Sequence, residues 1–131
     1  MKLKELFSTR ACGVLLWTIQ FAASAAAPSV SLEEAQAALD HSSAVVVDIR
    51  EPSEHASGVA KGALLIPMGQ LSQRLGDITT SKTQPLILVC ASQNRSSKMA
   101  DQLQAAGYTH VSYVKGGMNQ WTARGWPKIK P

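Results

Sequence analysis

One cysteine directly follows an apolar run in LILVCASQNRSS, residues 86–97. Cys90 ends that run, four small or polar residues come next, and Arg95 follows them. If a helix starts there, its unpaired N–H groups and partial positive charge would stabilise a thiolate. The residues between can also curl so that successive backbone N–H groups point at one centre. This segment therefore predicts a cysteine that acts as a nucleophile.

Two interpretations of Cys90 compete. Most cysteines are buried and inert, but the chain turns polar immediately after Cys90, which argues against burial. Arg95 either adds a positive charge near the sulfur or ties the loop to a carboxylate. Ser96 is expected to be the N-cap of the helix that follows. We favour a reactive cysteine that is not buried.

The spacing between Cys90 and Arg95 limits the size of the group that the loop can surround. Phosphatases with a cysteine loop have five residues at this place, because their loop must surround a phosphate. Here only four residues, 91–94, separate the cysteine from the arginine. The tighter loop suits a smaller group, such as a sulfur atom attached to Cys90, and it disfavours a phosphatase.

The first 25 residues have the composition of a secretory signal peptide. Lys2, Lys4 and Arg10 precede a mostly apolar stretch at 11–23, and small residues end at Ala25. The apolar stretch is shorter than the roughly 20 residues that a membrane-spanning helix needs. We expect cleavage after Ala25, no membrane anchor in the mature protein, and a periplasmic location.

The remaining 106 of the 131 residues, 26–131, are enough for one domain with its own core. Of the 13 Lys and Arg, three lie in the predicted signal, as does one of the nine Asp and Glu, so the rest carries a net charge of only +2. No cluster of Lys and Arg indicates nucleic-acid binding. Cys90 is the single cysteine left, so it cannot form an internal disulfide. His41, His55 and His110 lack metal-ligand spacing, so we expect no metal or cofactor and treat them as surface or packing residues.

Apolar runs alternate with helical patterns along this domain. Strands are expected at 44–49, 63–67, 86–90 and 111–114, and helices at 32–39, 68–75, 95–106 and 118–124, with a helical turn at 51–56. Continuous apolar strands between helices predict an α/β domain with a parallel sheet covered on both faces. Right-handed crossovers bring the carboxyl ends of all strands to one edge, where such sheets bind ligands. Asp48, Cys90 and the Lys115-Gly116-Gly117 turn should converge there, and the glycines should let the backbone approach the Cys90 loop.

Three ordered segments resemble the signatures of the rhodanese family of sulfurtransferases. They are VVVDIREPSEHASGVAKGALLIP at 45–67, LILVCASQNRS at 86–96, and YTHVSYVKGGMNQW at 108–121 followed by GWP. The resemblance covers essentially the whole chain after the predicted signal. It implies a single rhodanese-like, doubly wound α/β domain with about five parallel strands and helices on both faces.

The resemblance also implies a reaction. Cys90 would take a sulfane sulfur from a small anionic donor such as thiosulfate, become a persulfide, and pass the sulfur to cyanide or a thiol by two-step, ping-pong catalysis. Asp48 and Arg50, with Glu54, map onto the first signature and are expected to support the site, with Arg50 also able to meet anions. An ion pair between Arg50 and Glu54, four residues apart, is the alternative. The persulfide would be held by backbone N–H groups of the loop residues Ala91, Ser92, Gln93, Asn94, Arg95 and Ser96.

Three positions depart from the family pattern. Ala91 replaces a common basic residue, Gln93 a common glycine, and Val59 a histidine. Gln93 implies either a different loop path or a strained backbone, because only glycine adopts positive φ cheaply. Ala91 weakens the case for thiosulfate as the physiological donor. A second function therefore stays open, a sulfur carrier whose Cys90 persulfide serves a periplasmic partner protein with little turnover of small molecules.

Overall fold

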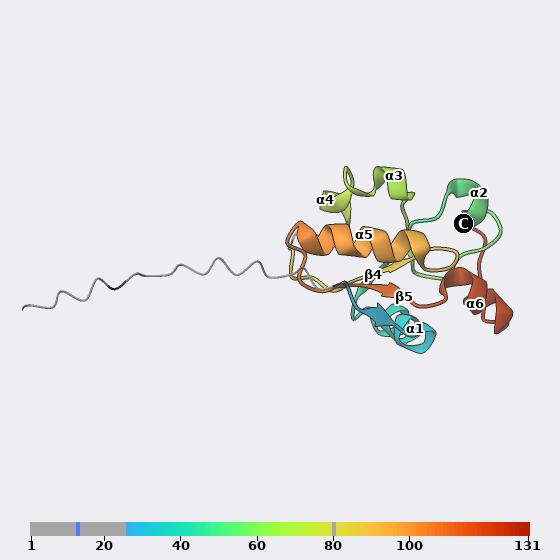
Figure 1. Ribbon diagram of the computed structural model, residues 1–131. Helices are drawn as coiled ribbons and strands as arrows, with labels where there is room; N and C mark the ends of the chain where they lie inside the picture. Colours follow the sequence, from blue (N-terminus) through green and yellow to red (C-terminus); the bar gives the residue numbers. More distant parts are fainter. Residues whose placement is uncertain (1–12, 14–25, 80) are drawn as a thin grey trace, which may run out of the picture.

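Five parallel strands form one sheet in the computed structural model, which describes Gly13 and residues 26–79 and 81–131. Their order across the sheet is β1-β5-β4-β2-β3 (Figure 1). This confirms the predicted fold class. Apart from Gly13, the predicted signal peptide lies outside the described residues. The strands are β1 (Ser29–Val30), β2 (Val45–Asp48), β3 (Leu64–Leu65), β4 (Leu86–Val89) and β5 (Val111–Val114).

Helices cover both faces of the sheet. In Figure 1, α3, α4 and α5 lie on one side of it, and α1 and α6 lie on the other. The single helix predicted at 68–75 is instead two short helices, because Leu71 and Ile78 enter the core from separate turns. The bounds are α1 (Leu32–His41), α2 (Pro52–His55), α3 (Met68–Leu71), α4 (Leu75–Ile78), α5 (Asn94–Ala105) and α6 (Gly117–Ala123).

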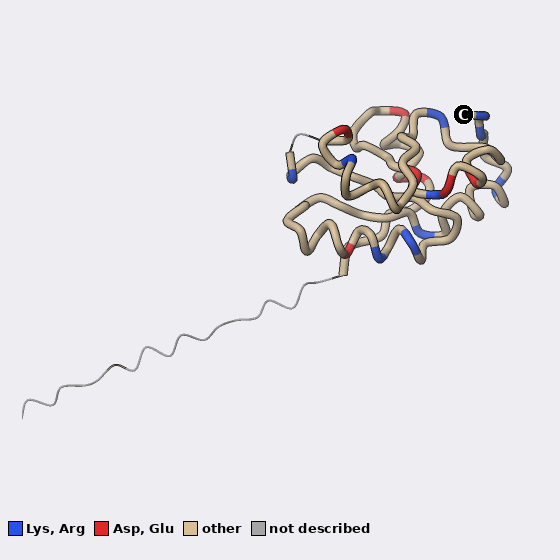
Figure 2. The backbone as a smooth tube through the Cα atoms, turned by 90° about the horizontal axis from the view of Figure 1, so that it is seen from above, with Lys and Arg blue, Asp and Glu red and all other residues tan. Residues whose placement is uncertain are grey.

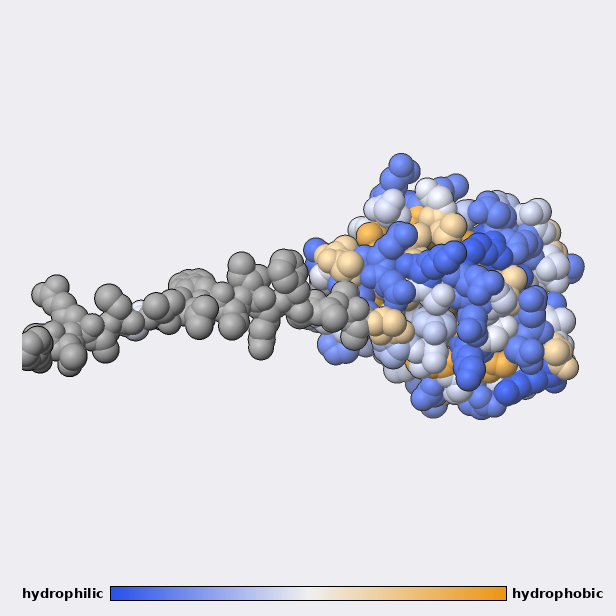
Figure 3. Space-filling view, in the orientation of Figure 1, coloured by the Kyte–Doolittle hydropathy of each residue, from blue (hydrophilic) through white to orange (hydrophobic). Residues whose placement is uncertain are grey.

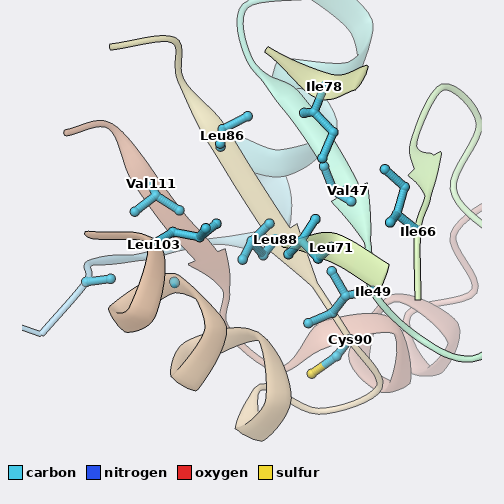
Figure 4. Close-up of a cluster of buried hydrophobic side chains, with 12 residues drawn as sticks. Val47, Ile49, Ile66, Leu71, Ile78, Leu86, Leu88, Cys90, Leu103 and Val111 are labelled. Atoms are coloured by element: carbon cyan, nitrogen blue, oxygen red, sulfur yellow. The ribbon is translucent and has the colours of Figure 1, made fainter. Parts of the chain in front are cut away.

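Two buried clusters lie on opposite faces of the sheet, and β4 contributes to both. Leu86 and Leu88 pack into the cluster on the α5 side, whereas Ile87 and Val89 pack into the cluster on the α1 and α6 side. A strand buried on both faces has no polar side to show, which explains its unbroken apolar run. Figure 4 draws the cluster on the α5 side, and Cys90 lies at its end.

The carboxyl edge of the sheet contains a topological switch point between β2 and β4. The chain leaves β2 toward β3 on one side and leaves β4 toward β5 on the other. Ligands of open parallel sheets bind in the crevice that forms where such connections diverge. Asp48 is the last residue of β2 and is in register with Val89, the residue before Cys90. The predicted convergence of these residues at one edge is confirmed.

Charged residues are dispersed over the molecule. Lys and Arg are interspersed with Asp and Glu along the chain (Figure 2), and the face in Figure 3 is mostly hydrophilic, with small separate hydrophobic areas. Within residues 26–79 and 81–131, no helix is long and apolar enough to cross a membrane. In the same part of the chain, no three side chains of metal-ligating type gather in one place.

Candidate active site

Cys90 lies just beyond β4, and its sulfur is directed toward α5 (Figure 4). The residue is 1 % exposed, and its Sγ lies 3.3 Å from Oγ of Ser96. The prediction that Cys90 is not buried is therefore wrong. The polar residues after it do not expose the sulfur, because α5 begins at Asn94 and its first turn packs against the end of the strand.

The backbone N–H groups that follow Cys90 are suited to an anion. Most of them have no hydrogen-bond acceptor among the described residues, and that of Asn94 reaches only Oγ of Ser92, at 3.4 Å. The first turn of a helix leaves its N–H groups unpaired and carries a partial positive charge. Negative charge on an atom bound to Cys90 would therefore be stabilised here. The N–H groups without an acceptor belong to Ala91, Ser92, Gln93, Arg95 and Ser96.

The carbonyl groups of the same loop are bound by α6. The carbonyl of Cys90 accepts the N–H of Met118 at 2.9 Å, and that of Ala91 accepts the N–H of Asn119 at 2.8 Å. A Cβ atom on Gly117 would lie only 2.2–2.6 Å from three carbonyl oxygens of the loop. Only glycine permits this approach, as the sequence predicted. The carbonyl groups of Cys90 and Ala91 are thus bound by α6, and the N–H groups of the loop are not used in these contacts.

Gln93, not the predicted Ser96, is the N-cap of α5, because the helix begins at Asn94. The φ of Gln93 is −163°, outside the positive region that favours glycine, so the loop follows a path that glutamine adopts without left-handed strain. Its Oε1 accepts the N–H of Gly116 at 3.1 Å and links the loop to the turn after β5. Ser96 lies in the first turn of α5, where its hydroxyl donates to the carbonyl of Gln93 and accepts from the thiol of Cys90.

Arg95 ties the loop to α2. Its two terminal nitrogens donate to the carboxylate of Glu54 at 2.7 and 2.8 Å. The hydrogen bond from Arg95 is the main reason why the pKa of Glu54 is lowered to about 2, and it also raises the pKa of Arg95. Of the two roles predicted for Arg95, the tie to a carboxylate is confirmed.

Asp48 and Arg50 form a buried ion pair at the end of β2. They are 0 % and 6 % exposed, and Arg50 donates to the carboxylate of Asp48 through Nε and Nη2 at 2.8–3.1 Å. Arg50 also donates to the carbonyls of Gly58 at 2.9 Å and Glu54 at 3.5 Å. The predicted Arg50–Glu54 ion pair is therefore wrong, since each side chain has another partner. Most donors of Arg50 are used inside the fold, and its predicted contact with anions stays a prediction.

His55 also belongs to this buried group, although its position beside Asp48 was not predicted from the sequence. It is 5 % exposed, and its Nε2 lies 3.3 Å from Oδ1 of Asp48 without forming a well-directed hydrogen bond. His41 and His110 are exposed, so of the three histidines only His55 has a packing role.

Known proteins resemble this chain in both sequence and fold. Residues 31–124 match the family model described as Rhodanese-like domain. A sulfurtransferase of Allochromatium vinosum is 33% identical over 92 residues, which cover 70% of this chain and 84% of that protein. The thiosulfate sulfurtransferase GlpE of Tolumonas auensis is 32% identical over 92 residues, which cover 70% and 85%. The human single-domain sulfurtransferase TSTD1 has a TM-score of 0.67 at 25% identity, covering 75% of this chain and 97% of that one. This chain is a member of the rhodanese family.

Proposed function

We propose that the protein is a sulfurtransferase that moves a sulfane sulfur from a donor such as thiosulfate to cyanide or a thiol, through a persulfide on Cys90. The observation that carries this proposal is the set of N–H groups without acceptors that follows Cys90 at the switch point of the sheet. The two relatives named as sulfurtransferases support the reaction class. Thiosulfate as the donor is supported by the name of the Tolumonas auensis protein.

In the first step, the thiolate of Cys90 attacks the outer sulfur of thiosulfate. The S–S bond of thiosulfate breaks, its electron pair leaves with sulfite, and Cys90 carries the transferred sulfur as a persulfide anion. The N–H groups of the loop stabilise the charge on that sulfur, in the manner of donors placed in advance around an oxyanion. The hydroxyl of Ser96 accepts from the thiol in the resting state, and it can turn to donate to the thiolate.

In the second step, the acceptor attacks the outer sulfur of the persulfide. The bond between that sulfur and Sγ of Cys90 breaks, and its electron pair returns to Cys90 as a thiolate. The sulfur leaves as thiocyanate or as the persulfide of the acceptor thiol. No oxidant or reductant is consumed, so the cycle needs only a donor and an acceptor, and ping-pong kinetics follow.

A second function is favoured by the burial of the nucleophile. Cys90 is 1 % exposed, and Ala91 provides no charge to draw a free anion toward it. A partner protein that moved the loop would reach the sulfur more readily than a small ion. In this alternative, Cys90 carries a persulfide for one periplasmic partner and turns over small molecules poorly.

Steady-state kinetics with thiosulfate and cyanide test the proposal. We expect thiocyanate to form with ping-pong kinetics, and no thiocyanate from Cys90→Ala. A persulfide that forms on Cys90 but yields negligible thiocyanate would instead support the carrier. Failure of thiosulfate and polysulfide alike to place sulfur on Cys90 would refute the sulfurtransferase, and hydrolysis of an aryl phosphate would point to a phosphatase.

We also propose export to the periplasm, on the basis of the basic, apolar and small-residue order of residues 1–25. Protein recovered from a periplasmic fraction should begin at Ala26 by N-terminal sequencing. Protein that retains Met1 and stays in the cytoplasmic fraction would contradict this localisation.

A further inference from the structure

The beginning of α6 is held by the Cys90 loop. The first N–H groups of any helix have no partner within the helix, and α6 begins at Gly117. Three N–H groups at this place donate to the loop, from Gly116 to Oε1 of Gln93 at 3.1 Å, from Met118 to the carbonyl of Cys90 at 2.9 Å, and from Asn119 to the carbonyl of Ala91 at 2.8 Å. The loop therefore supplies acceptors that the helix itself lacks.

The two carbonyl contacts determine where the next N–H groups of the loop point. A peptide group is planar and trans, so its N–H lies opposite its carbonyl. Because α6 binds the carbonyl of Cys90, the N–H of Ala91 points away from α6, and the bound carbonyl of Ala91 directs the N–H of Ser92 in the same way. Neither N–H has an acceptor among the described residues. Both belong to the set that the proposed function assigns to the transferred sulfur.

The contact of Gln93 differs from the other two because it depends on a side chain. An N-cap side chain commonly accepts from its own helix, but that of Gln93 makes no such bond to α5. Its oxygen is used for α6 instead, so one residue joins the starts of two helices. Glycine, which is common at this position in the family, has no atom that could replace Oε1.

The loop and the start of α6 lie too close together to move independently. A Cβ atom on Gly117 would lie 2.2 Å from the carbonyl oxygen of Ser92 and 2.5 Å from that of Cys90. A shift of the first turn of α6 would therefore displace the loop, and a bond that fixes this turn also fixes the loop.

Building on the function proposed above, we propose that Gln93 is a positioning residue for sulfur transfer, whose side chain caps α6 and so keeps the N–H groups of Ala91 and Ser92 aimed at the transferred sulfur. It acts through α6 and not by contact with the reacting atoms. Donors held in place favour the charge that develops on the outer sulfur during transfer. Loss of the cap should therefore slow the chemical step and leave the binding of the donor little changed.

The structural part of this proposal is tested by hydrogen exchange in the ¹⁵N-labelled protein. Gln93→Met keeps nearly the length of the side chain but removes the acceptor, so the amide of Gly116 should exchange about fivefold faster, as expected for one hydrogen bond. The amides of Met118 and Asn119 should also exchange faster. Gln93→Glu keeps an oxygen acceptor and should protect Gly116 as the parent protein does. Gln102→Met makes the same change as Gln93→Met on an exposed residue of α5 and should leave exchange unchanged.

The chemical part is tested by single-turnover uptake of sulfur from thiosulfate, with folded molecules counted by urea unfolding. Gln93→Met should lower the maximal rate constant about fivefold, while the thiosulfate concentration for half-maximal rate stays within about twofold. Gln102→Met should behave as the parent protein.

A purely structural role of Gln93 would lower resistance to urea without changing the rate per folded molecule. That result, or unchanged exchange of Gly116 in Gln93→Met, would overturn the positioning role. Faster exchange of Gly116 in Gln93→Met, combined with no sulfur uptake by the parent protein from thiosulfate or polysulfide, would instead refute the sulfurtransferase and leave Gln93 as a cap of α6 alone.

Discussion

Two polar sites lie on the same edge of the sheet, and their hydrogen bonding is opposite in kind. The carboxylate of Asp48 is surrounded by donors, with Arg50 bound to both of its oxygens and His55 beside it. Cys90, which follows the neighbouring strand, precedes a run of N–H groups that have no acceptor among the described residues. The carboxylate of Asp48 therefore has its partners within the fold, whereas the N–H groups after Cys90 are left to bind a ligand.

This difference suggests that the Asp48 site stabilises the fold and that the Cys90 site takes part in the chemistry. A buried group whose partners are all internal contributes to stability, because breaking the set leaves a buried charge uncompensated. Donors without acceptors do not stabilise the fold in this way, but those at the start of a helix can bind an anion. Variants at the Asp48 site should therefore change stability, and variants around Cys90 should change sulfur transfer.

The largest effect among these is expected from Gly117→Ala. Its Cβ would lie 2.2–2.6 Å from three carbonyl oxygens of the Cys90 loop, so the loop must shift. Displacement of reacting groups by about 1 Å can cost on the order of 100-fold in rate, and we expect a loss of sulfur transfer of that size. Steady-state formation of thiocyanate measures it.

Gly125→Ala is the matched control for this variant. Gly125 has a similar left-handed backbone, with φ of 70° against 57° at Gly117, but no atom lies within 4 Å of its added Cβ. It should cost about 1 kcal/mol of stability and leave sulfur transfer unchanged. Equal losses of activity in the two alanine variants would show that backbone strain, and not contact with the Cys90 loop, is responsible.

A smaller effect is expected from Glu54→Gln, which removes the carboxylate that holds Arg95. Both side chains are 33 % exposed, so the pair should contribute only about 1 kcal/mol to stability, and sulfur transfer should fall by less than about tenfold. Because the pKa of Glu54 is lowered to about 2, this stabilisation is complete above pH 4.5 and is lost as the pH falls toward 2. Urea unfolding of both proteins across this pH range should show their stabilities converge.

The exposed pair between Arg74 and Asp77 gives the comparison for that experiment. Their side chains are 43 % and 69 % exposed, so Asp77→Asn should change stability by less than about 0.5 kcal/mol at any pH. A stability difference between Glu54→Gln and the parent protein that stays constant down to pH 2 would contradict the assigned role of the carboxylate.

The smallest effect on sulfur transfer is expected from Asp48→Asn, although its effect on stability is large. The substitution leaves Arg50 buried without its counter-charge, which should cost about 3–5 kcal/mol. Transfer measured per folded molecule should stay within about twofold of the parent protein, provided that urea unfolding is used to count folded molecules. Asp40→Asn, at an exposed position on α1, should change neither quantity. A loss of transfer in fully folded Asp48→Asn would place this carboxylate in the chemistry and would break the comparison.

Much of the fold could be predicted because its signals are local. The strand at 111–114 and the start of α1 at Leu32 are as expected, since an apolar run and a capping box each depend on a few neighbouring residues. The expected helix at 68–75 is divided, because burial of Leu71 and Ile78 depends on the shape of the sheet beneath them. The order of apolar and polar residues in this segment does not specify the shape of the sheet.

The site could be predicted less completely, because its contacts join distant parts of the chain. Glu54 and Arg95 are 41 residues apart, so no spacing rule pairs them. The expected Arg50–Glu54 pair assumed helical spacing, but Arg50 precedes α2 and its side chain turns back to Asp48. Burial of Cys90 was missed because the polarity of its neighbours does not reveal where the following helix packs.

The most direct test of the central claim is the intact mass of the protein after treatment with thiosulfate. We predict a gain of one sulfur atom, reversed by cyanide with release of thiocyanate, and no gain in a Cys90→Ser variant whose fold is verified by urea unfolding. A peptide map should place the added sulfur on Cys90. Absence of the adduct in the parent protein, or its persistence in Cys90→Ser, would contradict the assignment of Cys90 as the sulfur-carrying residue.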